Sequence, residues 1–194
     1  MWRIIPPTRV LRAGNMKRKS DDIMQKTKLT IRLLERKDIS KIAEALQELG
    51  WNKPASQYER YLAQQEHGVR EVYVAFVEGQ FAGYLTICWE SSYRPFFVRS
   101  IPEIVDFNVL PKFRRMGVGT QLMDRAENEI AKVSSVAGIG VGVTADYGAA
   151  QRLYILRGYI PDGLGLHWKD HHVHYREDIV VDDELALFLT KELK

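Results

Sequence analysis

The sequence predicts an α/β (α+β) fold, in which six to seven strands form one mixed sheet and about four helices cover it. Three observations carry this prediction. Residues 71–77 and 81–89 are strand-like segments on either side of the turn signal Glu78-Gly79, which is typical of a β-hairpin. Residues 104–110 are apolar enough to form a buried central strand. An amphipathic helix at 117–132 then leads to a strand at 138–143, and such a crossover implies a parallel pair.

The remaining elements complete the sheet and its helical cover. Asp38 is a good cap for a helix that ends at Gly50. Residues 90–99 are polar and aromatic and indicate a loop. The other expected elements are strands at 29–33, from 158 onward and at 185–190, and helices at 56–68 and 148–156. No linker divides residues 28–194, which we therefore expect to form one domain.

Composition limits the class of protein. With 194 residues, 45% of them hydrophobic, the chain is long enough to bury a core without disulfides. Its single cysteine, Cys88, excludes an intramolecular disulfide framework and favours a reducing, cytoplasmic location. The net charge of +3 does not indicate nucleic-acid binding, and no apolar run is long enough to span a membrane.

Residues 1–27 differ from the rest of the chain. They carry an excess of basic residues, show no periodicity and lack the apolar core of a secretory signal. The basic residues are Arg3, Arg9, Arg12, Lys17, Arg18, Lys19 and Lys26. We expect a disordered leader, or a non-native start with Met16 or Met24 as the working one; a targeting or nucleic-acid arm is the alternative.

The segment that carries chemistry lies at residues 114–120, between the buried strand and the amphipathic helix. The first amides of a helix have no internal partners, and the helix dipole adds partial positive charge, so this is a favourable anion site. Gly117 and Gly119 allow close approach to the backbone, and Arg114 and Arg115 add cationic donors. A nucleotide P-loop is excluded because the Lys-Ser/Thr pair is missing, and a dinucleotide fingerprint because Leu122 replaces its third glycine.

Two motifs together resemble the GNAT N-acetyltransferase superfamily. The first is Arg-x-x-Gly-x-Gly at residues 114–119, after a strand and before a helix. The second, at residues 150–159, is similar to the family pattern A-x-x-L-Y-x-x-x-G-F/Y. The resemblance covers about residues 29–190, and the order of elements agrees. One departure is Tyr147, which stands where the family often has asparagine.

The resemblance implies a mostly antiparallel twisted sheet whose central parallel strands splay apart to admit acetyl-CoA, the acyl donor. The backbone amides of Met116 to Thr120 would hold the pyrophosphate, and the backbone of Val109 would pair with the pantetheine arm and the acetyl carbonyl. The full implied cofactor set is Val109, Leu110, Arg114, Arg115, Met116, Gly117, Val118, Gly119, Thr120 and Tyr147. Tyr154 would lie near the sulfur.

Acetyl transfer to an amine needs a base and an acid. A lysine-like amine is protonated at pH 7, with only about one molecule in 2,500 in the free-base form, so a general base is useful. Glu103 resembles the glutamate of histone-acetylating members, and Asp106 competes with it; a solvated or salt-bridged carboxylate is the alternative for both. Tyr154 is our choice of acid for the leaving thiolate, with aromatic packing as its alternative. Strand alternation puts Glu103, Val105, Phe107 and Val109 on one face and Asp106 on the other, unless a bulge intervenes.

Two further features have open interpretations. Gly138, Gly140 and Gly142 leave one strand face bare, which indicates either tight packing or close ligand approach. The late histidines favour an exposed hairpin near the acceptor entrance, and we expect no metal site. They are His167, His171, His172 and His174.

The sequence therefore predicts an acetyl-CoA-dependent N-acetyltransferase that acetylates the primary amine of a small molecule by direct transfer in a ternary complex. Acetylation of a protein or peptide amine is the first alternative. A non-catalytic acyl-CoA-binding sensor is the alternative from another class. The expected partners are acetyl-CoA and an amine acceptor, with no nucleic acid and no membrane, and a homodimer is the expected assembly.

Overall fold

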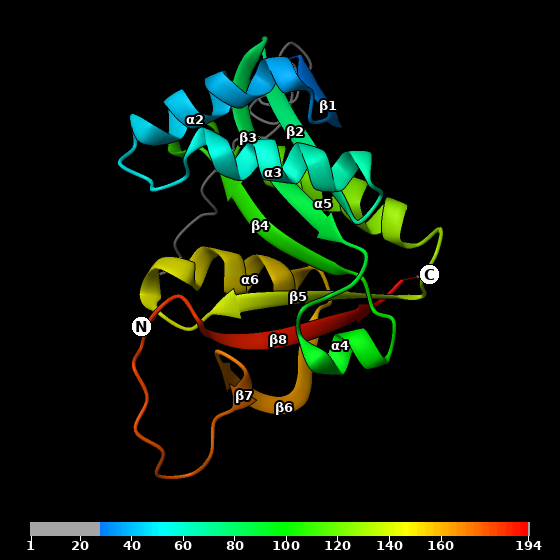
Figure 1. Ribbon diagram of the computed structural model, residues 1–194, viewed down its shortest axis with the longest axis vertical. Helices are drawn as coiled ribbons and strands as arrows, with labels where there is room; N and C mark the ends of the chain where they lie inside the picture. The colour runs from blue at the N-terminus through cyan, green and yellow to red at the C-terminus, as the bar shows by residue number, and fades with distance from the viewer. Residues whose placement is uncertain (1–27, 194) are drawn as a thin grey trace, which may run out of the picture.

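The computed structural model describes residues 28–193, which form an eight-stranded mixed sheet in the order β1-β2-β3-β4-β5-β8-β6-β7 (Figure 1). The basic leader predicted over residues 1–27 lies outside the described residues. The strands are β1 (Leu29–Leu33), β2 (Arg70–Val77), β3 (Gln80–Cys88), β4 (Glu103–Val109), β5 (Val136–Gly142), β6 (Ile160–Trp168), β7 (His171–His172) and β8 (Leu185–Glu192). The helices are α2 (Ile39–Gln47), α3 (Ala55–Glu66), α4 (Arg94–Val98), α5 (Val118–Ile130) and α6 (Gly148–Leu156).

The predicted fold class is confirmed, with one strand and one helix more than the sequence indicated. The extra strand is β7, a two-residue partner of β6. The extra helix is α4, in the segment predicted as a loop, where Pro95 stands in the first turn and Phe96 is fully buried. Proline is well suited to a helix start, and burial of one aromatic ring stabilises a helix too short to show a periodic pattern. No helix among the described residues is long and apolar enough to cross a membrane.

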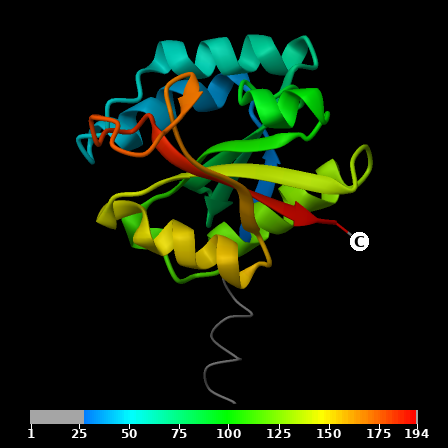
Figure 2. The same ribbon diagram turned by 90° about the horizontal axis from the view of Figure 1, so that it is seen from below.

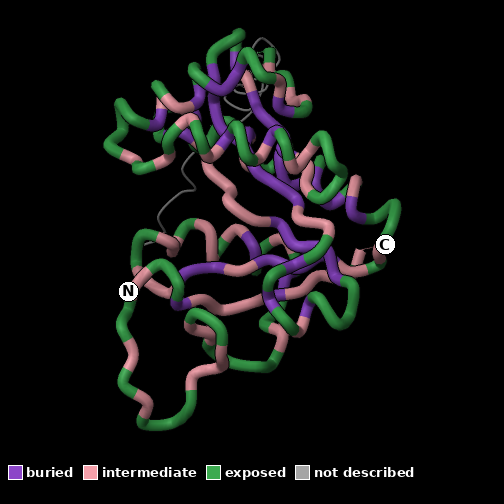
Figure 3. The backbone as a smooth tube through the Cα atoms, in the orientation of Figure 1, coloured by how far each residue is buried: buried purple, intermediate pink, exposed green. Residues whose placement is uncertain are grey.

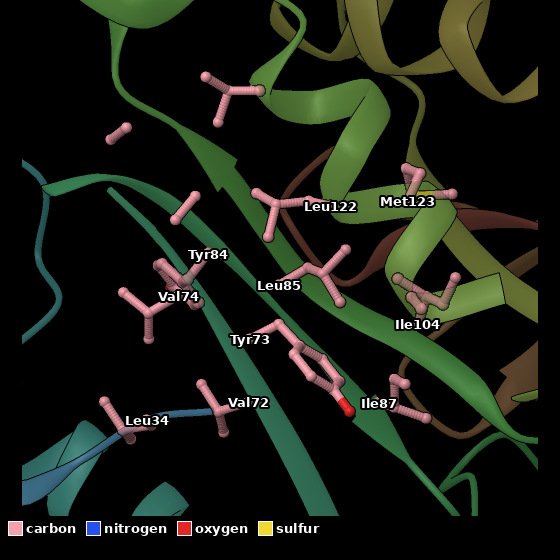
Figure 4. Close-up of a cluster of buried hydrophobic side chains, with 14 of the residues drawn as sticks. Leu34, Val72, Tyr73, Val74, Tyr84, Leu85, Ile87, Ile104, Leu122 and Met123 are labelled. Carbon is pink, nitrogen blue, oxygen red and sulfur yellow. The ribbon is translucent and has the colours of Figure 1, made fainter. Parts of the chain in front are cut away.

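Two helical layers enclose the sheet. Figure 2 shows α2, α3 and α4 on one face and α5 and α6 on the other. The inner side of α5 packs on β3 and β4, and Figure 4 shows Leu122 and Met123 of this helix among Leu85, Ile87 and Ile104 of the strands. These five side chains are at most 1% exposed. In Figure 3 burial is concentrated in the central strands and decreases toward the hairpin of β6 and β7.

The central parallel pair splays, as the sequence resemblance implied. Strands β4 and β5 pair only through Glu103 with Gly138 and Ile104 with Ile139, and they then diverge (Figure 1). From there β4 remains paired with β3 as far as Val109, and β5 pairs with β8. Within the described residues, the edge of β4 that faces β5 therefore has no strand partner after Ile104.

A β-bulge at Asp106 corrects the predicted alternation along β4. Thr86 pairs with Val105 and Tyr84 with Asn108, so one residue of β3 faces two residues of β4. Asp106 has the left-handed φ of +53°. The bulge brings the Asp106 side chain onto the face covered by α3, and places the side chains of Phe107 and Val109 beside Gly119 of α5 on the opposite face. The prediction that Phe107 and Val109 share a face with Glu103 was wrong, because an extra residue inverts the alternation.

Aromatic rings cover the glycine face of β5. A Cβ atom added to Gly138 would lie 2.3 Å from Phe96, one on Gly140 3.0 Å from Phe188, and one on Gly142 2.6 Å from Tyr147. These separations are below or at the limit of ordinary contact. Of the two interpretations of the glycines, the structure therefore supports tight packing, with aromatic rings from α4, β8 and the turn before α6 as the partners.

Candidate active site

The loop before α5 has the geometry of an anion site. Gly117 is the N-cap residue with φ of +79°, and Arg115 also has a positive φ, of +62°, so the chain turns sharply into the helix. In the described part of the chain, no protein group accepts a hydrogen bond from the backbone amides of residues 115–120. Arg114, Arg115 and Met116 are exposed, so this row of amides is open to an anionic ligand.

The first turn of α5 packs directly on the end of β4. The Cβ position at Gly119 is 3.1 Å from the Phe107 ring and 3.5 Å from a Val109 methyl group, which leaves little room for a larger residue. Arg114 donates a hydrogen bond of 3.2 Å from Nε to the carbonyl of Val109. The open amides of the loop and the unpaired edge of β4 are therefore adjacent. A ligand with a phosphate group next to an extended chain that contains amide groups would fit these loop amides and this strand edge.

Two predicted cofactor residues offer little to a ligand. Leu110 is 4% exposed, its amide donates to Ala82, and its carbonyl accepts from Phe113. Val118 has a buried side chain and contributes its amide alone. The structure thus distinguishes, within the predicted segment, residues with open backbone amides from residues that are buried in the fold.

Tyr147 lies at the end of β5 that has separated from β4. Its ring lies against Gly142, and its hydroxyl donates to the Asp183 carboxylate at 3.0 Å. Burial, the hydrogen bond to Asp183 and nearby negative charges, including that of Asp106, raise the pKa of Tyr147 to about 12. Tyr147 is therefore neutral at working pH and has Asp106 among its neighbours.

Tyr154 lies on α6 and is 5% exposed. Burial, and then the neighbouring Tyr147, raise its pKa well above the ordinary tyrosine value. The hydroxyl is therefore protonated throughout the physiological range and is available as a proton donor. Among residues 28–193 the Tyr154 hydroxyl has no side-chain hydrogen-bond partner, which leaves it free for a ligand atom.

A buried ion network fastens the end of α6 to α5. Arg157 donates from Nε and Nη2 to the two carboxylate oxygens of Glu127 at 2.9 and 2.8 Å, and also to Asp124 at 2.7 Å. Lys191 of β8 donates to Glu127 at 2.6 Å. Burial opposes the charge of Glu127, but the hydrogen bonds from Arg157 and Lys191 outweigh it and hold its pKa below the usual value. The network fixes the helix that carries Tyr154 relative to the helix that begins at the anion loop.

Glu103 lies at the closed end of the parallel pair, opposite Gly138. It is 7% exposed, and the Ser91 hydroxyl donates to its Oε2 atom at 2.5 Å. Burial raises the pKa of this carboxyl, although the hydrogen bond from Ser91 works in the opposite direction. A carboxylate with a raised pKa is suited to general base catalysis near neutral pH.

Asp106 lies at the open end and has a different environment. Its Oδ1 atom accepts hydrogen bonds from Lys53 and from Asn108 at 2.8 Å. Its Oδ2 atom accepts from Gln57 at 2.9 Å, Tyr61 at 3.1 Å and Tyr84 at 2.7 Å. Sequence reasoning named Asp106 and missed these five donors; the available signal was an acidic residue between the apolar residues Val105 and Phe107 of a central strand.

The late histidines lie on the hairpin of β6 and β7, as predicted, but two of them face inward. His167 and His172 pair across the hairpin, and their rings pack edge-on against Tyr93 at 5.0 and 6.0 Å. Burial and the neighbouring histidines lower the pKa of His167. Within residues 28–193, no group of three or more His, Cys, Asp or Glu side chains is placed to hold a metal ion.

Comparison with known proteins shows the family of this chain. A family model described as "Acetyltransferase (GNAT) family" matches residues 37–159, and the chain belongs to this family. No curated protein sequence matches.

Solved structures share the fold at low sequence identity. An N-acetyltransferase from Staphylococcus aureus Mu50 is 17% identical, with a TM-score of 0.63 over 86% of this chain and 99% of its own. The yncA protein of Salmonella typhimurium, solved with its cofactor acetyl-CoA, is 20% identical, with a TM-score of 0.61 over 86% of this chain and 94% of its own. The ribosomal-protein-alanine N-acetyltransferase of Brucella melitensis is 19% identical, with a TM-score of 0.62 over 84% and 99%.

The ion network around Glu127 yields a stability prediction. Arg157→Met leaves a buried carboxylate with one cation fewer, and we expect it to lower the free energy of unfolding by roughly 3 kcal/mol. The folded pKa of Glu127 lies below its unfolded value, so its contribution is present above the unfolded pKa, about 4.3, and is lost as pH falls through the folded pKa. Urea denaturation at pH 7 and pH 3 should show a large difference from wild type at pH 7 and a small one at pH 3. Equal differences at both pH values contradict this account.

Proposed function

We propose that this protein is an acetyl-CoA-dependent N-acetyltransferase that transfers acetyl directly to the primary amine of a small molecule in a ternary complex. One observation carries the proposal: the open amides of residues 115–120 lie next to the unpaired edge of β4. The amides suit a pyrophosphate, and the strand edge suits the two amide groups of a pantetheine arm, which pair as a strand would. The acetyl-CoA found in the Salmonella relative supports the same donor here.

Direct transfer is supported by the state of the cysteine. Cys88 lies between Arg70 and Glu103 on neighbouring strands, and burial raises the pKa of its thiol. A thiolate is the reactive form of cysteine, so this environment does not favour a covalent acetyl carrier. The acceptor amine therefore attacks the thioester carbon itself, the carbon–sulfur bond breaks, and the thiolate of coenzyme A leaves.

Glu103 and Tyr154 have environments that suit the two proton transfers of the reaction. Glu103 has a raised pKa and its Oε1 atom takes part in no hydrogen bond with another described residue, so it can accept a proton from the amine through water. Asp106 is less suitable as a base, because five donors already occupy its two oxygens. Tyr154, held protonated by burial, supplies a proton to the leaving thiolate.

A small acceptor is favoured by the cover over the base. The segment with Ser91 and Phe96 encloses Glu103, and Phe96 is fully buried against β5. A folded protein surface would not reach a carboxylate enclosed in this way without moving α4.

The cytoplasmic location and the homodimer remain predictions.

The proposal is tested by thiol release from acetyl-CoA with a panel of polyamines, amino acids and alanine-terminated peptides. We expect release that depends on a small primary amine and yields the acetylated amine by mass spectrometry. Turnover of the peptides alone would show a protein acceptor instead. Tight binding of acetyl-CoA with no turnover of any amine would show a non-catalytic sensor.

Replacing Tyr154, the proposed acid, should slow the chemical step without weakening the binding of coenzyme A. Tyr154→Phe removes one hydroxyl, and we expect kcat to fall by about 10²-fold, the usual size of a general-acid effect, with an unchanged Kd for coenzyme A by calorimetry. Tyr159→Phe is the matched control, since Tyr159 is also fully buried and its ring lies 6.1 Å from that of Tyr154. An active Tyr154→Phe enzyme, or equal losses in the two variants, would remove Tyr154 as the acid.

Replacing the base should change the pH profile. The base must be ionised to act, so we expect log kcat/KM of wild type to fall as pH drops through the raised pKa of Glu103. Glu103→Gln should lose this limb together with most of the rate. Ser91→Ala removes a hydrogen bond that favours the ionised form, so its limb should move to higher pH. A Glu103→Gln enzyme that keeps full rate across pH 6–9 contradicts the assignment.

A further inference from the structure

The bulge in β4 is held in place by hydrogen bonds to the Asp106 side chain, four of which come from outside the strand. Asp106 has a left-handed φ of +53°, a conformation that L-residues rarely adopt. Such a conformation persists only where the surroundings fix it. Aspartate and asparagine adopt a positive φ more readily than most residues, but this preference alone does not fix one backbone conformation. Contacts made by the Asp106 side chain must therefore fix it.

Four separate parts of the chain supply those contacts. Lys53 lies between α2 and α3, and Tyr84 on β3. The donors to the carboxylate are Lys53, Gln57, Tyr61, Tyr84 and Asn108. The Asp106 side chain is only 12% exposed, so these hydrogen bonds are made largely out of water and are correspondingly strong. We call this group of six residues the Asp106 cluster.

The Asp106 cluster determines where the open edge of β4 lies. The bulge comes two residues after the last pairing with β5, at Ile104, and three residues before Val109. Because of it, Phe107 and Val109 turn toward Gly119 in the first turn of α5. The same carboxylate is bound by Gln57 and Tyr61 of α3 on the opposite face of the sheet. The cluster thus connects α3 to the strand edge beside the anion loop.

We propose that Asp106 is a positioning residue for acetyl transfer: the Asp106 cluster fixes the β4 bulge and thereby aligns the strand edge at Val109 with the acetyl thioester. This inference rests on the proposed function. Asp106 neither contacts the reacting atoms nor takes a proton, because its oxygens are fully engaged. Its effect is on the geometry of the reaction, and a misplacement of about 1 Å is enough to cost about 10²-fold in rate.

Lys53 is the cationic member of the cluster and its most adjustable one. Its side chain is 23% exposed, and it forms the ion pair with Asp106 from a loop rather than from a helix or strand. A charged donor makes the strongest hydrogen bond to a carboxylate. Lys53→Met should therefore weaken the cluster without breaking the other four contacts, and Lys53→Arg should restore it.

The test compares Asp106→Asn with Asp38→Asn. Asparagine keeps the size and the tolerance for positive φ, but its NH2 group cannot accept hydrogen bonds from the donors that face one of the two carboxylate oxygens. Asp38 is the matched control, since it is 2% exposed and is held by both Nη atoms of Arg32 at 2.6 and 2.8 Å, on a 3-10 turn outside the proposed site. Both variants lose a buried ion pair, so both should lower Tm.

We expect Asp106→Asn to lower kcat by about 10²-fold at every pH from 6 to 9, with a much smaller change in the Kd for coenzyme A, because the amides of residues 116–120 would still hold the pyrophosphate. Asp38→Asn should keep the wild-type kcat. Lys53→Met should lower kcat less than Asp106→Asn, and Lys53→Arg should recover most of it.

Three outcomes would overturn the inference. An Asp106→Asn enzyme with the kcat of wild type would show that the cluster only stabilises the fold. Loss of the acidic limb of the pH profile in Asp106→Asn would make Asp106 the base. Equal losses of kcat in the Asp106 and Asp38 variants would attribute the effect to stability. A wild-type protein that acetylates no amine would contradict the proposed function itself, and therefore also this inference.

Discussion

The short pairing of the two central parallel strands is the constraint on which the rest of the site depends. β4 and β5 share two residue pairs and then separate, although each stays paired on its other side. Separation leaves a half-exposed edge of β4 without a strand partner after Ile104. In the proposed function, the amide groups of the pantetheine arm pair with that edge.

Side chains pack on the faces of both separated strands. On β5, aromatic rings from three segments lie against glycines, and the last of them is Tyr147 at the open end. On β4, the bulge at Asp106 turns Phe107 and Val109 toward the helix that begins at the anion loop. Close packing therefore accompanies the separation along both strands.

The sequence predicted the elements well and their fine geometry less well. Periodicity and glycine spacing identified the anion loop, the crossover helix and the parallel pair, because these depend on local patterns. The bulge at Asp106 could not be predicted, since four of the five donors to Asp106 lie 22 to 53 residues away in the chain. Helix α4 was missed for a similar reason: its five residues are too few for a periodic signal, and burial of Phe96 stabilises it.

The candidate site residues show the same difference between what local sequence patterns predict and what depends on the three-dimensional surroundings. The segment from Val109 to Thr120 was located by motif and is contiguous in the structure, whereas the roles of two carboxylates on one strand were left open by the sequence. Their environments separate them: Glu103 is enclosed with a single hydroxyl donor, and Asp106 is saturated by five donors. Burial and hydrogen-bond occupancy, on which the proposed choice of base rests, are three-dimensional properties.

A crystal structure of the complex with coenzyme A tests the central claim most directly. The account predicts the pyrophosphate on the amides of residues 116–120 and the pantetheine amides paired with the β4 edge between Val105 and Val109, with β4 and β5 as far apart as in the free protein. Coenzyme A bound away from the α5 loop, or strands that close over an unoccupied edge, would contradict it.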